Sequence, residues 1–395
     1  MPDFALRPAD ESARDLVRKL AAEIVAPIAR AADAERRFPR EAIDALARHG
    51  LLGAPLAPSL GGLGWDAMQL ALAYEEIGRV DQSVRGFLSV HLGLVVQCLD
   101  TYASAAQKTE WLPRLARGEV LGAYALTERG AGSDAAALTT QAYPDGPGAW
   151  RLRGEKVWIT NGLSAGLFIV FATVDPALRH KGVTAFLVRG DAPGLVRERM
   201  PGAELGHRAS EHAILRFDGV RVGAADVVGE VGAGFGVAMG GLDHGRLGVA
   251  AGAVGLLQAC LDLVTDFARS RRQFGKRIGD FQMVQERIAD LACDTEAARL
   301  LTWKAAWKAV RNEKRTRDVS MAKLFATEAA CRWSAEAVML HGSRGYVNER
   351  PVERHFRDAQ GLRIYEGTSL VQRIVIAREI LGRETAAPAA GEAAK

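Results

Sequence analysis

The apolar residues of this 395-residue chain change their spacing twice, and no other feature constrains the fold as strongly. Between residues 10 and 120 they recur every three or four positions, which is typical of amphipathic helices. The first stripe consists of Leu16, Leu20, Ile24 and Ile28. From about Gly122 to Gly229 the apolar segments are short, β-rich and separated by turn residues. After Gly236 the helical spacing returns, with long helices expected at about 281–311 and 319–340 and a short one at Ser369–Leu381.

This order of helices, strands and helices favours a β-domain between two helical parts and argues against alternating βαβ units. The expected strands include Lys156–Thr160, Leu167–Val174, Val183–Val188 and Ala213–Phe217. The turns between them predict an antiparallel sheet or barrel. We therefore expect an N-terminal helical domain at 1–120, a middle β-domain at 121–232 and a C-terminal helical domain at 233–384. The tail at 385–395 consists mainly of Ala, Pro, Gly and Glu, and we expect it to be disordered.

The charge distribution argues against a nucleic-acid partner. Charged residues make up 25% of the chain, and the formal net charge is only +4. The densest basic run, Arg269 to Arg277, also contains Phe274 and Gly275, which suits a local anion site better than a nucleic-acid surface. No run approaches the ~20 apolar residues that span a bilayer, and no apolar stretch follows a basic start at the N-terminus. We therefore expect no membrane segment and a cytoplasmic location.

The cysteines are scattered through helical patterns without a CxxC pair. They are Cys98, Cys260, Cys293 and Cys331. We interpret all of them as buried reduced thiols, as in proteins of a reducing compartment, and we expect no metal site.

Certain stretches of the chain carry residues that are suited to chemistry. They are Tyr124–Asp134 (YALTERGAGSD), Lys156–Gly162 (KVWITNG), Arg271–Gln282 (RRQFGKRIGDFQ) and Ile364–Arg378 (IYEGTSLVQRIVIAR). The first offers the hydroxyls of Thr127 and Ser133 and closely spaced glycine N–H groups, which can bind a flavin edge and phosphates. Alone, that stretch would be an ordinary turn. Together, in this order and spacing, the four stretches resemble the FAD-dependent acyl-CoA dehydrogenase family over nearly the whole chain, and this resemblance implies a C-terminal four-helix bundle.

The resemblance implies an FAD site. The expected contacts within one chain are Tyr124, Leu126, Thr127, Gly132, Ser133, Trp158, Ile159, Thr160 and Thr368. The positions that match contacts to the FAD of a neighbouring subunit are Arg271, Phe274 and Gln282, and those that match a glycine turn beneath the adenosine are Met339, Gly342 and Ser343. Met339 and Ser343 depart from the polar residue and the second glycine that are common there. The resemblance also implies a homotetramer, a dimer of dimers, with electron-transferring flavoprotein as the electron acceptor.

Glu366, within YEGTS, is the candidate catalytic base. The α-proton of a thioester is weakly acidic, and its removal needs a carboxylate in a water-poor pocket, where desolvation raises the pKa of the carboxyl group. The resemblance implies that the Glu366 N–H and a ribityl hydroxyl stabilise the charge on the thioester oxygen, and that flavin N5 accepts the β-hydride. Gly367 lets the chain turn close to the thioester.

Some branches of the family carry the base on the helix that follows the β-domain. This chain has Gly245 at that position, which cannot act as a base and so agrees with the presence of Glu366. Asp243 and Arg246, in the same stretch, match positions near the pantetheine and the active site.

Arg85 and Ser89 are the candidates for recognising the acyl group, because they lie four residues apart on one face of an expected helix at 82–97. In the glutaryl-CoA dehydrogenase branch an arginine at the Arg85 position binds the distal carboxylate. The alternatives are that Arg85 extends to the surface or pairs with a protein carboxylate. We predict α,β-dehydrogenation of a short-chain or dicarboxylyl, glutaryl-like acyl-CoA to the 2-enoyl-CoA.

Other reactions remain open. The same arginine fits a branch that removes sulfinate from sulfinopropionyl-CoA without oxidation, although Glu366 argues against that reaction. The remaining alternative is a non-catalytic protein that binds acyl-CoA or FAD.

Overall fold

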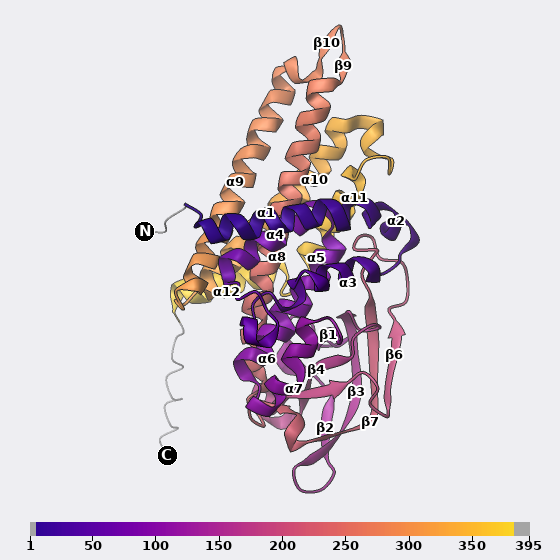
Figure 1. Ribbon diagram of the computed structural model, residues 1–395, viewed down its shortest axis with the longest axis vertical. Coiled ribbons are helices and arrows are strands. Elements are labelled where there is room, and N and C mark those ends of the chain that lie inside the picture. The colour runs from indigo at the N-terminus through magenta and orange to yellow at the C-terminus, as the bar shows by residue number, and fades with distance from the viewer. Residues whose placement is uncertain (1–4, 383–395) are drawn as a thin grey trace, which may run out of the picture.

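The computed structural model describes residues 5–382, and it confirms the order of helical, β and helical parts (Figure 1). The tail expected to be disordered at 385–395 lies outside these residues. A helical N-terminal domain and a helical C-terminal domain flank a central mixed sheet in the sequence. In Figure 1 the sheet lies at the lower right, and the long C-terminal helices extend upwards.

The N-terminal helices are α1 (Pro8–Leu20), α2 (Ala26–Glu35), α3 (Arg40–Arg48), α4 (Ala67–Val80), α5 (Gln82–Leu88), α6 (Gln97–Tyr102) and α7 (Ala105–Ala116). Three of them, α4, α5 and α7, begin at polar residues whose side chains accept hydrogen bonds from N–H groups of the first turn. Asp66, for example, accepts hydrogen bonds from the N–H groups of Met68 and Gln69 at the start of α4. The helix expected at 82–97 is not uniform, because it widens into a π-helix at Ser89–Val96.

The sheet has eight strands, and the expectation of a purely antiparallel sheet is wrong in one respect. The strands are β1 (Gly122–Ala125), β2 (Gln141–Pro144), β3 (Ala149–Thr160), β4 (Leu167–Thr173), β5 (Val183–Arg189), β6 (Leu195–Arg199), β7 (His212–Gly223) and β8 (Val227–Val228). Their order is β6-β7-β3-β2-β4-β5-β8, and β4 pairs in parallel with both β1 and β2. Between β1 and β4 the chain makes the long β2–β3 excursion, so these two strands are free to run in the same direction.

The C-terminal helices follow the predicted ranges closely, with one helix that was not expected. They are α8 (Gly234–Ser270), α9 (Gln282–Val310), α10 (Thr316–His341), α11 (Val352–Leu362) and α12 (Ser369–Leu381). The short strands β9 (Arg272–Gln273) and β10 (Lys276–Arg277) form a hairpin at the tip of α8 and α9 (Figure 1). Helix α11 lacks an apolar stripe because charged residues occupy its buried face, including Arg354, Arg357 and Asp358.

Helix α8 is the central element of the core. By length and composition it is the one described helix that could cross a membrane. However, 78% of its most apolar window is buried inside the protein, where α8 packs against α4, α9 and α10. The cysteine prediction is wrong for Cys293, which is exposed, whereas the other three are buried.

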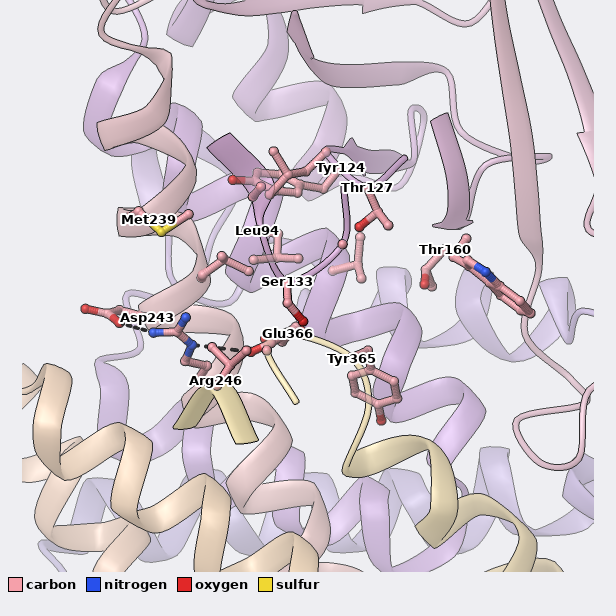
Figure 2. Close-up of a pocket in the computed structure, with 18 of the residues that line it drawn as sticks. Leu94, Tyr124, Thr127, Ser133, Thr160, Met239, Asp243, Arg246, Tyr365 and Glu366 are labelled. Atoms are coloured by element: carbon pink, nitrogen blue, oxygen red, sulfur yellow. Dashed lines mark hydrogen bonds and ion pairs between the residues drawn. The ribbon is translucent and has the colours of Figure 1, made fainter. Parts of the chain in front are cut away.

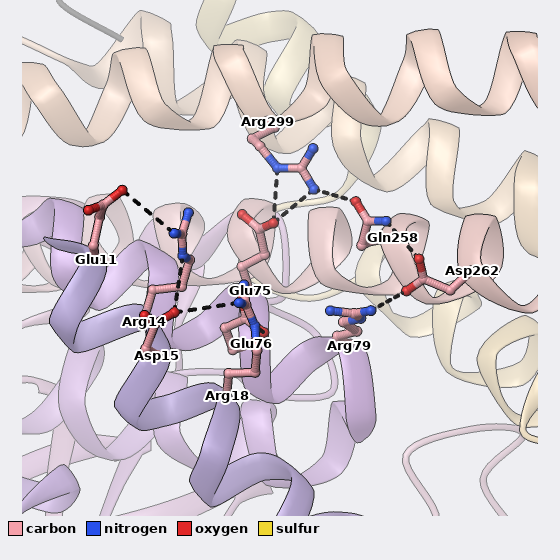
Figure 3. Close-up of polar contacts among 10 residues, drawn as sticks. All are labelled: Glu11, Arg14, Asp15, Arg18, Glu75, Glu76, Arg79, Gln258, Asp262 and Arg299. Atoms are coloured by element: carbon pink, nitrogen blue, oxygen red, sulfur yellow. Dashed lines mark hydrogen bonds and ion pairs between the residues drawn. The ribbon is translucent and has the colours of Figure 1, made fainter. Parts of the chain in front are cut away.

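Polar contacts join the N-terminal helices to the C-terminal ones (Figure 3). Arg299 on α9 lies 2.9 Å from Glu75 on α4 and also donates to Gln258 on α8. Arg357 of α11 forms a buried ion pair with Asp33 of α2 at 2.6 Å. These contacts tie α9 to α4 and α8, and α11 to α2. Helix α8 also lines the cavity described next.

Candidate active site

A cavity of about 720 Å³ lies where the sheet meets helices α5, α8 and α12. It brings together most of the residues expected at the site: Arg85, Tyr124, Leu126, Thr127, Gly132, Ser133, Trp158, Ile159, Thr160, Asp243, Arg246, Glu366 and Gly367. Tyr365 also lines this cavity, and Figure 2 shows how these side chains lie around it. Residues far apart in the sequence therefore converge on one space.

Glu366 and Gly367 form a tight turn between α11 and α12. Both have left-handed backbone conformations, with φ of 55° for Glu366 and 87° for Gly367. A non-glycine residue in this region is uncommon, and the conformation persists only where surrounding contacts hold it. Arg246 Nε and Gln372 Nε2 both donate to the Glu366 carbonyl oxygen, at 3.3 and 3.2 Å. Arg246 is itself held by Asp243 at 3.1 Å (Figure 2).

The Glu366 carboxyl group is buried, and its environment changes its affinity for protons. Its Oε2 atom is buried and has no hydrogen-bond partner. Desolvation raises the pKa of Glu366 to about 7, against the opposing attraction of Lys323, Arg85 and Arg246. Such a group is ionised in a large fraction of molecules at neutral pH and still binds a proton well, which suits general-base catalysis.

Gly245 on α8 faces this carboxyl group. A Cβ atom at position 245 would overlap Glu366 Oε2. The glycines one and two turns further along α8 leave room in the same way, because a Cβ at Gly248 would lie 2.8 Å from Ser89 Oγ and one at Gly252 would lie 2.5 Å from Arg85 Nε. Because these three positions of α8 carry no side chain, Glu366, Ser89 and Arg85 can pack directly against the helix backbone.

Arg85 is fully buried, with 0% of its surface exposed, so the alternative that it extends to the surface is wrong. Its Nε donates to Gln82 at 3.0 Å, and its Nη2 donates to the Tyr365 hydroxyl. Its Nη1 atom is buried without a partner. Within residues 5–382 no carboxylate lies close enough to Arg85 to form an ion pair. A buried guanidinium without an ion-pair partner is costly.

The loop after β1 rests on a buried ion pair. Lys156 Nζ lies 2.8 Å from Glu128 and donates to the Leu126 carbonyl oxygen at 3.0 Å. Glu128 also accepts hydrogen bonds from the N–H groups of Thr139 and Thr140. The ion pair therefore holds both ends of the segment that presents Thr127 to the cavity.

Relatives of this sequence match along almost its whole length. Family models for the N-terminal, middle and C-terminal domains of acyl-CoA dehydrogenases match residues 7–119, 123–220 and 232–381. The mitochondrial short-chain specific acyl-CoA dehydrogenase of Mus musculus is 40% identical over 368 residues, which cover 93% of this chain and 89% of the mouse protein. The chain belongs to the acyl-CoA dehydrogenase family.

Solved acyl-CoA dehydrogenase structures share the fold. Butyryl-CoA dehydrogenase from Megasphaera elsdenii superimposes with a TM-score of 0.94 and 36% identity, covering 96% of this chain and all of the other. A glutaryl-CoA dehydrogenase in complex with glutaryl-CoA gives a TM-score of 0.92 and 36% identity, covering 96% of this chain and 97% of the other. The protein is therefore an oxidoreductase of this family, and its cofactor is FAD.

The cavity of this acyl-CoA dehydrogenase fits a flat aromatic cofactor. Trp158 sits in a β-bulge of β3 with φ of 58°, and 53% of its surface is exposed, although a tryptophan in a strand is usually buried. The Thr127 and Thr160 side chains and the backbone of Gly132 line the same space. These residues would hold FAD through ring contact and hydrogen bonds.

The remaining expected residues do not line this cavity. Arg271, Phe274 and Gln282 lie at the α8–α9 tip, and Met339, Gly342 and Ser343 lie at the end of α10. Phe274 is 92% exposed and Met339 is 76% exposed, so both could meet another subunit, which remains a prediction. Ser89 is buried beside Gly248, and its hydroxyl group opposes the desolvation that raises the pKa of Glu366. Thr368 caps α12 by accepting a hydrogen bond from the Val371 N–H.

Sequence reasoning missed Lys323, a fully buried residue of α10 whose ammonium group donates to the Gly367 carbonyl oxygen. The available signal was a stripe of polar residues at helical spacing, Ser320, Lys323 and Thr327, on a helix that otherwise buries small apolar residues. A lysine within such a stripe indicates a buried charge with a specific partner.

Proposed function

We propose that this acyl-CoA dehydrogenase converts an acyl-CoA to the 2-enoyl-CoA, with Glu366 removing the α-proton. The observation that carries the proposal is the buried, unpartnered Oε2 atom of Glu366 at the cavity, with its pKa raised by desolvation to about 7. When bound, FAD accepts the hydride that leaves the β-carbon. The protein's own part is to hold the carboxylate, the thioester and a dry pocket in place.

The turn at Glu366 and Gly367 supports this role. Its carbonyl groups point to donors on α8, α10 and α12, namely Arg246, Lys323 and Gln372. The contacts therefore fix the peptide planes, and with them the N–H groups that would stabilise negative charge on the thioester oxygen. A flexible turn would lose that preorganisation.

For the substrate, we propose a short dicarboxylyl thioester such as glutaryl-CoA. Arg85 supports this choice, because its Nη1 atom is buried, unpartnered and at the cavity. The second candidate is an unsubstituted short acyl chain, which the names of the mouse relative and the Megasphaera elsdenii enzyme favour. Only the dicarboxylyl thioester has a distal carboxyl group to lose as CO2 after oxidation.

We also propose that the protein assembles as a homotetramer and passes electrons to an electron-transferring flavoprotein. Large apolar side chains on the C-terminal helices and their connections support an assembly, because they are exposed in the single chain: Phe274, Met283, Met339, Leu370 and Leu381. Neighbouring copies of the chain would cover these side chains.

The test of the reaction is the Glu366→Gln variant, which keeps the shape of the side chain but accepts no proton. We expect it to retain FAD and to bind acyl-CoA, while anaerobic bleaching of the flavin slows by at least about 10²-fold. Near-normal bleaching would refute the assignment of the base. A wild-type protein whose flavin is bleached by no acyl-CoA, but which releases sulfinate from sulfinopropionyl-CoA, would support the non-oxidative alternative.

A further inference from the structure

Lys323 of α10 lies directly beneath the turn that carries the proposed base. Its side chain is fully buried, and its Nζ atom lies 2.7 Å from the Gly367 carbonyl oxygen. Its neighbours along the buried face of α10, Ser320 and Thr327, are uncharged and equally buried. A buried ammonium group therefore contacts the residue that follows Glu366 in the chain.

One carbonyl contact does not account for this charge. A buried ammonium group is costly unless an anion compensates it. No carboxylate of residues 5–382 forms an ion pair with Lys323. Glu328, on the same helix, already binds Arg363 and the Ser369 hydroxyl. Glu366 forms no ion pair with Lys323, but it is the neighbouring carboxylate whose charge acts most strongly on the Lys323 ammonium group, and its Oε2 atom forms no hydrogen bond.

Other groups also face Glu366, and they are committed elsewhere. Arg246 on α8 is paired with Asp243, while Arg85 on α5 is bound by Gln82 and Tyr365. Desolvation and the charge of Glu366 both raise the pKa of three phenol groups, those of Tyr74 on α4, Tyr124 on β1 and Tyr365. Phenols with a raised pKa carry no charge at neutral pH. Arg85 and Lys323 are thus the facing cations without an ion-pair partner, and of these two Lys323 is the one that donates to the Glu366–Gly367 turn.

We propose that Lys323 is a positioning residue for Glu366: it fastens the Glu366–Gly367 turn through the Gly367 carbonyl oxygen and supplies the positive charge that keeps the buried carboxylate in its anionic form. This inference rests on the proposed function, because it assumes that Glu366 is the base. The electrostatics of Glu366 agree with this role. Desolvation raises the pKa of Glu366, and Lys323 is the cation that lowers it most. Desolvation likewise lowers the pKa of Lys323 to about 8.

The test separates the charge from the hydrogen bond. Lys323→Met removes both, Lys323→Gln removes the charge but keeps a donor, and Lys323→Arg keeps the charge. Gln372→Met is the matched control, because Gln372 donates to the same Gly367 carbonyl oxygen at 2.9 Å without a charge. The rate of anaerobic flavin reduction is measured from pH 5.5 to 9.5 with butyryl-CoA or glutaryl-CoA, whichever the wild type uses faster.

We expect the midpoint of the acidic limb to move upward by about one pH unit or more in Lys323→Met and Lys323→Gln. Reduction at pH 7 should fall about fivefold or more and recover at alkaline pH. Lys323→Arg should keep the wild-type midpoint, and Gln372→Met should be slower at every pH without a shift. An infrared titration of the protonated carboxyl band of Glu366, with Glu366→Gln to identify it, should show the same shift without turnover.

A wild-type midpoint in either folded, uncharged variant would overturn the proposal. So would misfolding of both uncharged variants while Lys323→Arg folds, because the ammonium group would then serve the fold. The proposed function fails separately, if Glu366→Gln reduces its flavin normally. An inactive Glu366→Gln variant combined with unshifted Lys323 variants would refute only the role of Lys323.

Discussion

Replacing Arg85 by Met tests the proposed substrate most directly. Methionine has a similar length and no charge, so it fills the space beside Gly252 and removes only the guanidinium group. In the structure, Nη1 has no partner, while Nε and Nη2 are held by Gln82 and Tyr365. The guanidinium group is therefore already oriented, and its free N–H groups are available to bind an anion.

The magnitude follows from these free N–H groups. A charge-assisted contact between a distal carboxylate and the free N–H groups of Arg85 in a dry pocket contributes roughly 2–4 kcal/mol. At ~1.4 kcal/mol per tenfold, Arg85→Met should lower kcat/KM for glutaryl-CoA by about 30- to 1000-fold. For butyryl-CoA the loss should be small, because that substrate has no distal charge.

The pH of the assay matters, because Arg85 also helps to lower the pKa of Glu366. Its removal should raise that pKa further, which would slow both substrates near neutral pH. Steady-state kinetics should therefore be measured at pH 8.5 to 9, where Glu366 is ionised in both proteins. Arg85→Lys is the control that keeps a charge but loses the planar fork.

Equal losses of kcat/KM on glutaryl-CoA and butyryl-CoA at that pH would refute the reasoning, and Arg85 would then be structural. A wild-type preference for butyryl-CoA would refute it as well. The enzyme would then act on unsubstituted short chains, and the role of Glu366 would be unaffected.

Further predictions concern the base, the loop and the assembly. Flavin reduction by the wild type should rise with pH through about 7 and level off above it, because Glu366 must lose its proton before it can accept one; a stopped-flow pH series checks this. Gly245→Ala should slow reduction strongly, because its Cβ would overlap Glu366 Oε2, and adding Glu366→Gly to Gly245→Glu should restore measurable activity relative to Glu366→Gly alone. Lys156→Met should lower the free energy of unfolding in urea by about 3–5 kcal/mol, and Glu128→Gln in that background should recover most of the loss. Sedimentation of the purified protein should show a tetramer, and a fully active monomer would contradict the assembly.

Hydrophobic spacing was sufficient to predict the helix–strand–helix order and the positions of α9, α10 and α12. It failed for α11, because Arg354, Arg357 and Asp358 are buried there through ion pairs and hydrogen bonds, which leave no apolar stripe in the sequence. The parallel pairing of β4 with β1 and β2 could not be predicted from hydrophobic spacing either, because strand direction depends on which distant segments pair. The domain boundaries at 120/121 and 232/233 stay predictions.

For the site, motif residues such as Thr127, Trp158 and Glu366 were predicted to lie together, and they do line one cavity. Their roles stay predictions. The sequence could not show that Arg85 is buried without a carboxylate, because its surroundings come from α8 and from Tyr365, far away in the chain. Lys323 was missed for the same reason: its contact with Gly367 spans 44 residues.

The overlap between position 245 and the Glu366 carboxyl group constrains how a base could move between the two positions during evolution. A lineage that acquired a side chain at 245 while Glu366 was present would push two groups into one space, and the intermediate would be impaired. A lineage that first lost Glu366 would pass through a protein without a base. The effect of each substitution should therefore depend strongly on the other. No single mutation converts one active arrangement into the other, so the residues at 245 and 366 should be inherited together.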